Sequence, residues 1–319
     1  MKIRKILAIS LIAFTLLTGC SSGNSDLKEI GIIQFVQHPA LDEAREGFIE
    51  ELANGGYKDG DNIKLDYQNA SGDTSNNATI ASSFANDKKE LVLAIATPSA
   101  QAIAQNIKNV PVLVTAVTDP ESAGLVKSNE DVGGNISGTS DKAPIKRQLE
   151  LLHEAFPDAS KIGIIYSSSE DNSKVIFNEA KGILDEMKLT TVEATVQNSN
   201  DVQSVMQSLV GKIDVLYVPT DNVISSSMST ISDICIKNKI PIVASEESQV
   251  KNGALFTVGI NYKELGKQTA RMAIKILKGE MTVDKMPIEY LEKKSFAINE
   301  EVAKALDVDI DKIRKIAEK

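Results

Sequence analysis

Small polar residues that can hold an anion follow one of the apolar runs of this sequence. Thr97, Pro98 and Ser99 come directly after the run that ends at Ala96, where a helix is expected to begin. The first turn of a helix presents unpaired N–H groups and a partial positive charge, and proline suits that turn because its missing N–H would have no partner there. This segment is therefore predicted to bind a carboxylate or a phosphate.

Carboxylates and aromatic rings follow other apolar runs in the same way. Asp119, Asp221 and Glu246 are candidates for pairing with an ammonium group, and Phe35 and Tyr166 can flank a flat apolar group. The alternative is that the polar residues only cap helices, which contributes about 1 kcal/mol each. Capping does not account for the rings and several carboxylates, so we predict a binding site. The candidate ligand-binding residues are Gln34, Phe35, His38, Thr97, Pro98, Ser99, Thr118, Asp119, Tyr166, Ser169, Asn172, Thr220, Asp221, Asn222 and Glu246.

The composition argues against several other classes of protein. The formal net charge of −9 is the wrong sign for a nucleic-acid-binding surface. Apart from GCSSG at 19–23, at the end of the N-terminal apolar segment, the sequence contains no GxSxG, CxxC or HExxH motif, and it has only two His and two Cys, which leaves little for nucleophilic, metal-dependent or acid–base catalysis. Cys235 falls among apolar helical positions and is expected to be a buried hydrophobic residue. We predict no enzymatic activity, no cofactor and no metal.

The N-terminal segment predicts export and a lipid anchor. Basic residues precede an apolar stretch at 6–17, which is shorter than the roughly 20 residues that a membrane span needs. The closing residues Leu17-Thr18-Gly19-Cys20 resemble the bacterial lipobox, in which the cysteine is acylated. The alternative is an ordinary signal peptide that contains a cysteine by chance. We predict a signal peptide at 1–19, lipidation of Cys20, a tether at 20–28 and a body held at the extracytoplasmic face of the cell membrane.

Short β-rich runs alternate with helical patterns along the rest of the chain, which is typical of parallel sheets covered by helices. Turn formers at 131–135 separate two similar halves, and a second change comes at 257–261. Two such lobes would direct the C-terminal ends of their strands toward one cleft, where open α/β sheets bind ligands. Strands are expected at 30–36, 63–67, 91–96, 112–117, 162–166, 191–195, 215–218, 242–244 and 254–258. Helices are expected at 41–54, 75–87, 99–107, 145–156, 172–187, 202–209, 223–238 and 262–278.

Five segments in order give the chain a specific family resemblance. From about residue 28 to residue 308 it resembles the tryptophan/tyrosine ABC-transporter substrate-binding lipoproteins. The resemblance implies an α/β fold of the type I periplasmic-binding-protein class, with two Rossmann-like lobes joined by a three-segment hinge. We expect lobe 1 at 29–136 and 260–287, and lobe 2 at 137–259 and 288–319. The segments that carry the resemblance are QFVQHPALD at 34–42, DYQNA at 66–70, AIATP at 94–98, TAVTDP at 115–120 and YVPTDN at 217–222.

The resemblance also implies a function and partners. It predicts a monomeric receptor that captures an aromatic amino acid, tryptophan first and then tyrosine or phenylalanine, between closing lobes. The partners would be an ABC permease and its ATPase. Related amino-acid receptors place an acidic residue on the ligand's ammonium where this chain has Glu246, which favours Glu246 for that role, with Asp221 next. Two alternatives stay open, a receptor for another flat solute such as a purine and a lipoprotein that signals the presence of its ligand.

Overall fold

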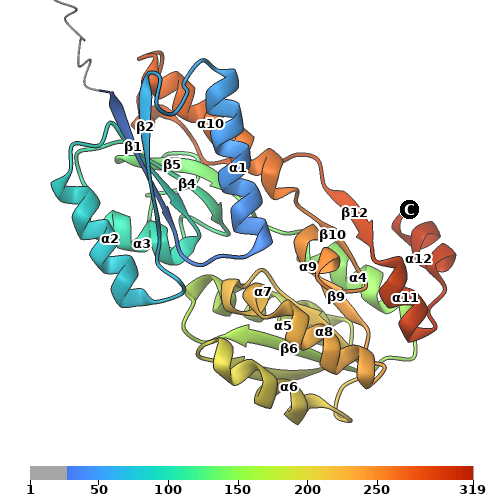
Figure 1. The fold of residues 1–319 in the computed structure, drawn as a ribbon. Helices are drawn as coiled ribbons and strands as arrows, with labels where there is room; N and C mark the ends of the chain where they lie inside the picture. The colour runs from blue at the N-terminus through green and yellow to red at the C-terminus, as the bar shows by residue number, and fades with distance from the viewer. Residues whose placement is uncertain (1–26, 319) are drawn as a thin grey trace, which may run out of the picture.

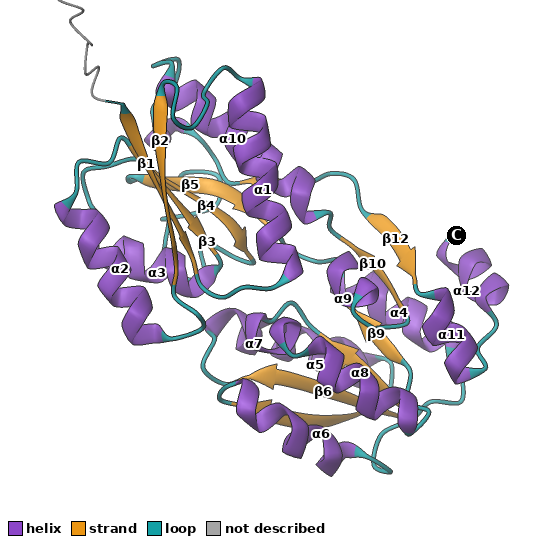
Figure 2. Cartoon of the chain, in the orientation of Figure 1, coloured by secondary structure: helices purple, strands orange, loops and turns teal. Residues whose placement is uncertain are grey.

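The computed structural model describes residues 27–318, which fold into two α/β lobes (Figure 1). Each lobe is built on a six-stranded sheet flanked by helices (Figure 2). The predicted fold class is therefore confirmed. The predicted signal peptide at 1–19, the lipidation site Cys20 and the tether as far as residue 26 lie outside the described residues. Within residues 27–318, none of the helices has the length and apolar character to cross a membrane.

The strands of the first sheet are all parallel, in the order β11-β5-β4-β3-β1-β2. One face packs against α1 and α10, and the other against α2 and α3. The central strands are fully buried because both faces are covered, as their continuous apolar runs predict. The elements are β1 (Lys28–Gln34), α1 (Pro39–Asn54), β2 (Ile63–Asn69), α2 (Thr74–Asn86), β3 (Leu91–Ile95), α3 (Thr97–Asn106), β4 (Val112–Val117), β5 (Ile136–Ser140), α10 (Tyr262–Leu277) and β11 (Glu289–Tyr290).

The second sheet has the order β12-β10-β9-β8-β6-β7, with β12 antiparallel to β10 and the other pairs parallel. Helices α4, α5, α11 and α12 share one hydrophobic core, and α6 and α8 share the other. The elements are α4 (Ile145–Ala155), β6 (Lys161–Ser167), α5 (Asp171–Glu186), β7 (Thr190–Val196), α6 (Val202–Leu209), β8 (Val215–Val218), α7 (Asn222–Ser226), α8 (Met228–Lys237), β9 (Ile242–Ala244), α9 (Glu247–Lys251), β10 (Phe256–Gly259), β12 (Ser295–Ile298), α11 (Glu300–Leu306) and α12 (Ile310–Ala317).

The chain passes between the lobes three times, after β5, after β10 and after β11. The predicted three-segment hinge is therefore present, but two of the predicted boundaries are shifted. Strand β5 pairs with β4, and β11 pairs with β5, so residues 137–140 and 288–290 belong to the first lobe and not to the second. No strand is predicted at 136–140, because the sequence ISGTS is small and polar, although its backbone extends the parallel sheet.

Helices α1 and α10 pack unusually closely across the first lobe. A Cβ atom added at Gly266 would lie 1.9 Å from the carbonyl oxygen of Ala44, and one added at Gly47 would lie 2.1 Å from the carbonyl oxygen of Lys263. Only glycine permits this approach, because the obstructing atoms are backbone. The contact brings a late segment of the chain onto an early one.

Candidate ligand-binding site

The loops that follow the C-terminal ends of the strands meet between the lobes. On one side, Lys251 Nζ of α9 forms an ion pair with Glu43 Oε1 of α1 at 2.8 Å. On another, Gln101 Nε2 of α3 donates a hydrogen bond to Asp171 Oδ2 at the start of α5, at 3.3 Å. These contacts join residues of different lobes, so the lobes are closed on each other in this structure.

A buried chain of hydrogen bonds also joins the lobes. His38, which precedes α1, places its Nε2 3.2 Å from Asn222 Oδ1 at the start of α7. The Asn222 amide nitrogen donates to the carboxylate of Glu170, whose other oxygen accepts the Val223 N–H at 3.1 Å. Burial lowers the pKa of His38 to about 4, so its imidazole is neutral at pH 7. Burial also raises the pKa of Glu170, and the charge of nearby Asp221 adds to that shift.

Two buried carboxylates near the crossing segments, those of Asp141 and Glu246, are close enough for the charge of one to act on the other. The Tyr262 hydroxyl donates to Asp141 Oδ2 at 2.6 Å, and the Ser225 hydroxyl donates to Glu246 Oε1 at 3.0 Å. The second oxygen of each group, Asp141 Oδ1 and Glu246 Oε2, is buried and has no hydrogen-bond partner among residues 27–318. Burial raises the pKa of Asp141, and burial with the charge of Asp141 raises the pKa of Glu246 to about 8. Such a pair favours a cation, which would restore both ionised forms.

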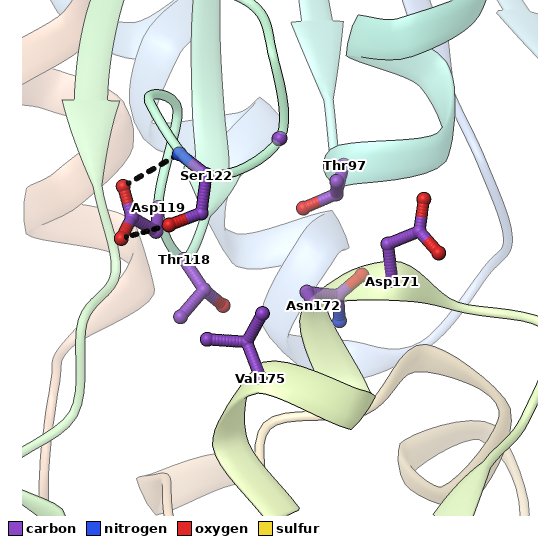
Figure 3. Close-up of a pocket in the computed structure, with 8 residues that line it drawn as sticks. Thr97, Thr118, Asp119, Ser122, Asp171, Asn172 and Val175 are labelled. Atoms are coloured by element: carbon purple, nitrogen blue, oxygen red, sulfur yellow. Dashed lines mark hydrogen bonds between the residues drawn. The ribbon is translucent and has the colours of Figure 1, made fainter. Parts of the chain in front are cut away.

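A small pocket lies between the lobes (Figure 3). Thr97 and Thr118 approach it from the first lobe, and Asn172 and Val175 approach it from α5 of the second. Its volume of 20 Å³ holds roughly one water molecule. The lining residues are Thr97, Thr118, Asp119, Ser122, Ala123, Asp171, Asn172 and Val175.

Backbone strain marks the strand ends that border the cleft. Ala96, which precedes α3, has φ 80° and ψ 153°, a region that glycine normally occupies. Ala116 has φ 55° where the register between β4 and β5 shifts. Thr97, the first residue of α3, lines the pocket, so the predicted anion-binding helix start faces the cleft. Phe35 belongs to the same buried core cluster as Ala96, Ala116 and Tyr262.

Two of the three predicted ammonium partners accept hydrogen bonds within their own lobe instead. Asp221 accepts from the backbone N–H groups of Ser167 at 2.5 Å and Ile224 at 2.9 Å, and so joins β6 to α7. Asp119 accepts from both the backbone and the hydroxyl of Ser122. Of the three, Glu246 retains a buried oxygen without a partner among the described residues.

Tyr166 points into the second lobe instead of flanking the cleft. Its ring stacks on Phe177, with centroids 4.6 Å apart, and its hydroxyl donates to Glu193 at 2.6 Å. Strand alternation explains the difference from the prediction, because Tyr166 shares the face of β6 that packs on α5. The predicted aromatic wall is therefore not formed by this residue.

The remaining predicted residues divide between the cleft and the loops that support it. His38, Thr97, Thr118, Asn172 and Asn222 lie between the lobes, as described above. The others bond within one lobe. Gln34 bonds Asp42 and Arg45, the Pro98 carbonyl and the Ser99 hydroxyl bond Asn77, the Ser169 hydroxyl bonds the Gln197 carbonyl, and the Thr220 hydroxyl bonds Ser245.

Sequence reasoning missed three residues of the site, Asp141, Glu170 and Tyr262. Asp141 follows β5, which the sequence did not reveal as a strand, and Tyr262 begins α10 directly after the second crossing. Glu170 stands in a run of Ser and acidic residues that reads as a capping segment. The available signal was position, because each follows a strand or a crossing at the edge where the predicted residues gather.

Two α/β lobes that are joined by three crossings, with buried charged groups between them, define a two-lobed solute-binding protein with the periplasmic-binding-protein fold. The chain belongs to the ABC transporter substrate binding protein family, whose family model matches residues 29–319. Such proteins act outside the cytoplasm and pass a small molecule to a membrane permease and its ATPase.

One named relative and two solved structures are similar to this chain over nearly its whole length. The tyrosine-binding protein of Clostridioides difficile is 46% identical over 320 residues, which covers 96% of this chain and 92% of that protein. An ABC domain from Streptococcus pneumoniae in complex with L-Trp is 36% identical, with a TM-score of 0.86, over 91% of this chain and 98% of that one. The ligand-free, open structure of a substrate-binding protein with adhesive properties from Clostridium difficile is 48% identical, with a TM-score of 0.68, over 89% and 96% of the two chains.

Sequence identity and structural superposition rank these two structures in opposite order. The sequence is closer to the open structure, yet the fold superimposes better on the complex with L-Trp. Higher sequence identity with poorer superposition points to a different arrangement of the lobes. This agrees with the closed arrangement in which Lys251 and Glu43 form an ion pair across the lobes.

Proposed function

We propose that this chain is the receptor of an ABC importer for an aromatic amino acid. The observation that carries the proposal is the pair of buried carboxylates, Asp141 and Glu246, each with one oxygen unpartnered among residues 27–318. A buried, unpaired charge costs several kcal/mol, and an ammonium group would relieve that cost for both. The tyrosine-binding relative and the L-Trp complex support the aromatic class.

The second charge of an amino acid has a matching partner on the first lobe. The start of α3 offers unpaired N–H groups beside Thr97, and the Thr118 hydroxyl and the Asn172 amide lie around the same pocket. A zwitterion would therefore contact α3 of one lobe and Glu246 of the other. Since both contacts exist together only when the lobes are near each other, binding would drive closure.

The aromatic ring requires an apolar neighbour, and Phe35 is our candidate. It is buried at the end of β1, in the cluster that contains Ala96, Ala116 and Tyr262 at the cleft edge of the first lobe. A ring packed there would gain about 0.5–1.5 kcal/mol beyond its area burial.

The proposal also covers the state in which the protein works. We propose a monomer without catalytic activity, lipidated on Cys20 and tethered to the outer face of the cell membrane. Support comes from the lipobox-like sequence that ends at Cys20. A multiply acylated terminus would hold the protein durably, because each buried CH₂ contributes about 0.8 kcal/mol.

Isothermal titration of residues 21–319 with tryptophan, tyrosine, phenylalanine and adenine tests the ligand. We expect saturable binding of tryptophan or tyrosine at one molecule per chain and no heat with adenine. Because the chain contains no Trp, the change in tryptophan fluorescence on binding, excited where the six Tyr residues do not absorb, gives a second readout. Binding of adenine alone would replace the amino-acid proposal with the purine-like alternative, and no heat with any aromatic amino acid would refute it.

A further inference from the structure

His38 occupies a capping position but does not act as a cap. It precedes α1 with an extended backbone, φ −157° and ψ 161°, and its side chain makes no capping hydrogen bond. The residue is only 5% exposed, and its Nε2 instead approaches Asn222 Oδ1 of the opposite lobe at 3.2 Å. The side chain therefore belongs to the cleft and not to its own helix.

The neighbours of His38 fix where its proton sits. Glu170 accepts hydrogen bonds from the Asn222 amide nitrogen and from the Val223 N–H, so the Asn222 oxygen is the atom that faces His38. An amide oxygen can only accept, so Nε2 carries the hydrogen. In the neutral ring Nδ1 is then an acceptor, and among residues 27–318 it has no hydrogen-bond partner.

We propose that His38 Nδ1 accepts a hydrogen bond from the ring of the bound amino acid, so that the site selects rings that carry an N–H or O–H. This inference rests on the proposed function. The ammonium is matched by Asp141 and Glu246, so the donor left over on tyrosine or tryptophan is the phenol O–H or the indole N–H.

The fold places His38 where a ring would reach it. His38 follows β1, and Asp141 follows β5, three strand positions away in the first sheet. Neighbouring strands are about 4.8 Å apart, so the two loops start about 14 Å from each other. An amino acid with its ammonium beside Asp141 would therefore extend its side chain toward His38. Phenylalanine would leave the buried acceptor unpaired, which is the situation in which sites discriminate most strongly.

Titration of the mature protein with tyrosine, tryptophan, phenylalanine and 4-fluorophenylalanine tests this role. We expect tyrosine and tryptophan to bind at least tenfold more tightly than the other two. His38→Leu also removes the bond to Asn222 and should weaken every ligand, but tyrosine and tryptophan should weaken more, so that their tenfold advantage over phenylalanine disappears. The same change at the other histidine, His153→Leu on α4, is the matched control and should alter nothing.

The outcomes separate this inference from the function on which it rests. Equal binding of tyrosine and 4-fluorophenylalanine by the wild-type protein would overturn the role of His38, and that comparison needs no variant. An equal loss for all ligands in His38→Leu would also overturn it, while the aromatic receptor stands. If none of the aromatic amino acids binds, the proposed function fails and the role of His38 fails with it.

Discussion

The burial of the Asp141 and Glu246 carboxylates favours the binding of a positively charged group of the ligand. One oxygen of each carboxylate accepts a hydrogen bond from a hydroxyl, that of Tyr262 or Ser225, and the other oxygen is buried without a partner among the described residues. Their mutual repulsion and burial make the closed cleft unfavourable for two negative charges without a cation. We infer that the same charges make closure favourable once an ammonium lies between them.

Substitution of these carboxylates tests that role. Glu246→Gln and Asp141→Asn should each weaken amino-acid binding at least tenfold, which corresponds to about 1.4 kcal/mol, because a neutral amide cannot pair with the ammonium. Neither should lower the thermal stability of the ligand-free protein, since each removes a buried charge. The control is Glu186→Gln on the exposed end of α5. Wild-type affinity in Glu246→Gln, measured by calorimetry, would remove this residue from the site.

The affinity should also depend on pH through His38. Its pKa is about 4 in the closed structure, against the ordinary value of 6.5 that we expect when the lobes separate. Protonation of His38 therefore favours the open protein, so its contribution to binding is full above pH 6.5 and is lost as the pH falls from 6.5 toward 4. At pH 5.5 we expect about tenfold weaker binding than at pH 7.5. Calorimetry at several pH values should show a smaller drop in His38→Leu, and an identical slope would contradict the assignment.

The individual residues of the site were only partly predictable. His38, Thr97 and Glu246 were chosen for their position after strands, and that position does not depend on how the side chains pack. Tyr166 did not, since a shift of one residue along a strand sends a side chain to the other face. Asp221 caps helix α7, and the sequence alone does not distinguish a carboxylate that caps a helix from one that binds a ligand.

Helices and strands were predicted correctly where burial requires apolar residues in a regular pattern. The ends of most predicted strands and helices lie within one or two residues of the observed ends, but α9, α11 and α12 were not predicted, although α12 has isoleucines at helical spacing. The sequence did not reveal β5, β11 and β12, which are small, polar or short and are held by backbone pairing. The expected helix at 223–238 is divided into α7 and α8 at Ser227, whose φ of −112° interrupts the helix.

The packing of α1 on α10 gives a test of stability that is independent of ligand. Gly266→Ala should destabilise the protein by about 1–3 kcal/mol or more, because the new Cβ would meet the Ala44 carbonyl at 1.9 Å. The matched control is Gly182→Ala in α5, where nothing lies within 4 Å and alanine should stabilise the helix by up to about 1 kcal/mol. Urea unfolding measures both. A Gly266→Ala protein as stable as the wild type would show that the helices can move apart.

At the scale of the whole molecule, function depends on the relative position of the lobes. Small-angle scattering of the mature protein should show a smaller radius of gyration with saturating tyrosine or tryptophan than without it. The reason is that contacts such as the pair of Lys251 and Glu43 form only across the closed cleft. An exposed ion pair contributes at most about 1 kcal/mol, so the ligand must supply most of the closing energy. Identical scattering curves would show that the ligand does not shift the lobes.

The late position of α10 in the chain has a consequence for how the protein is made. Helix α10 covers the same face of the first sheet as α1, yet it follows the strands β6 to β10 of the second sheet in sequence. A polypeptide that leaves the ribosome N-terminus first therefore exposes the apolar side of α1 until residue 277 has been synthesised. The first lobe is therefore completed only after β6 to β10 of the second lobe have been made, and truncation anywhere before Tyr262 removes the helix that packs on α1.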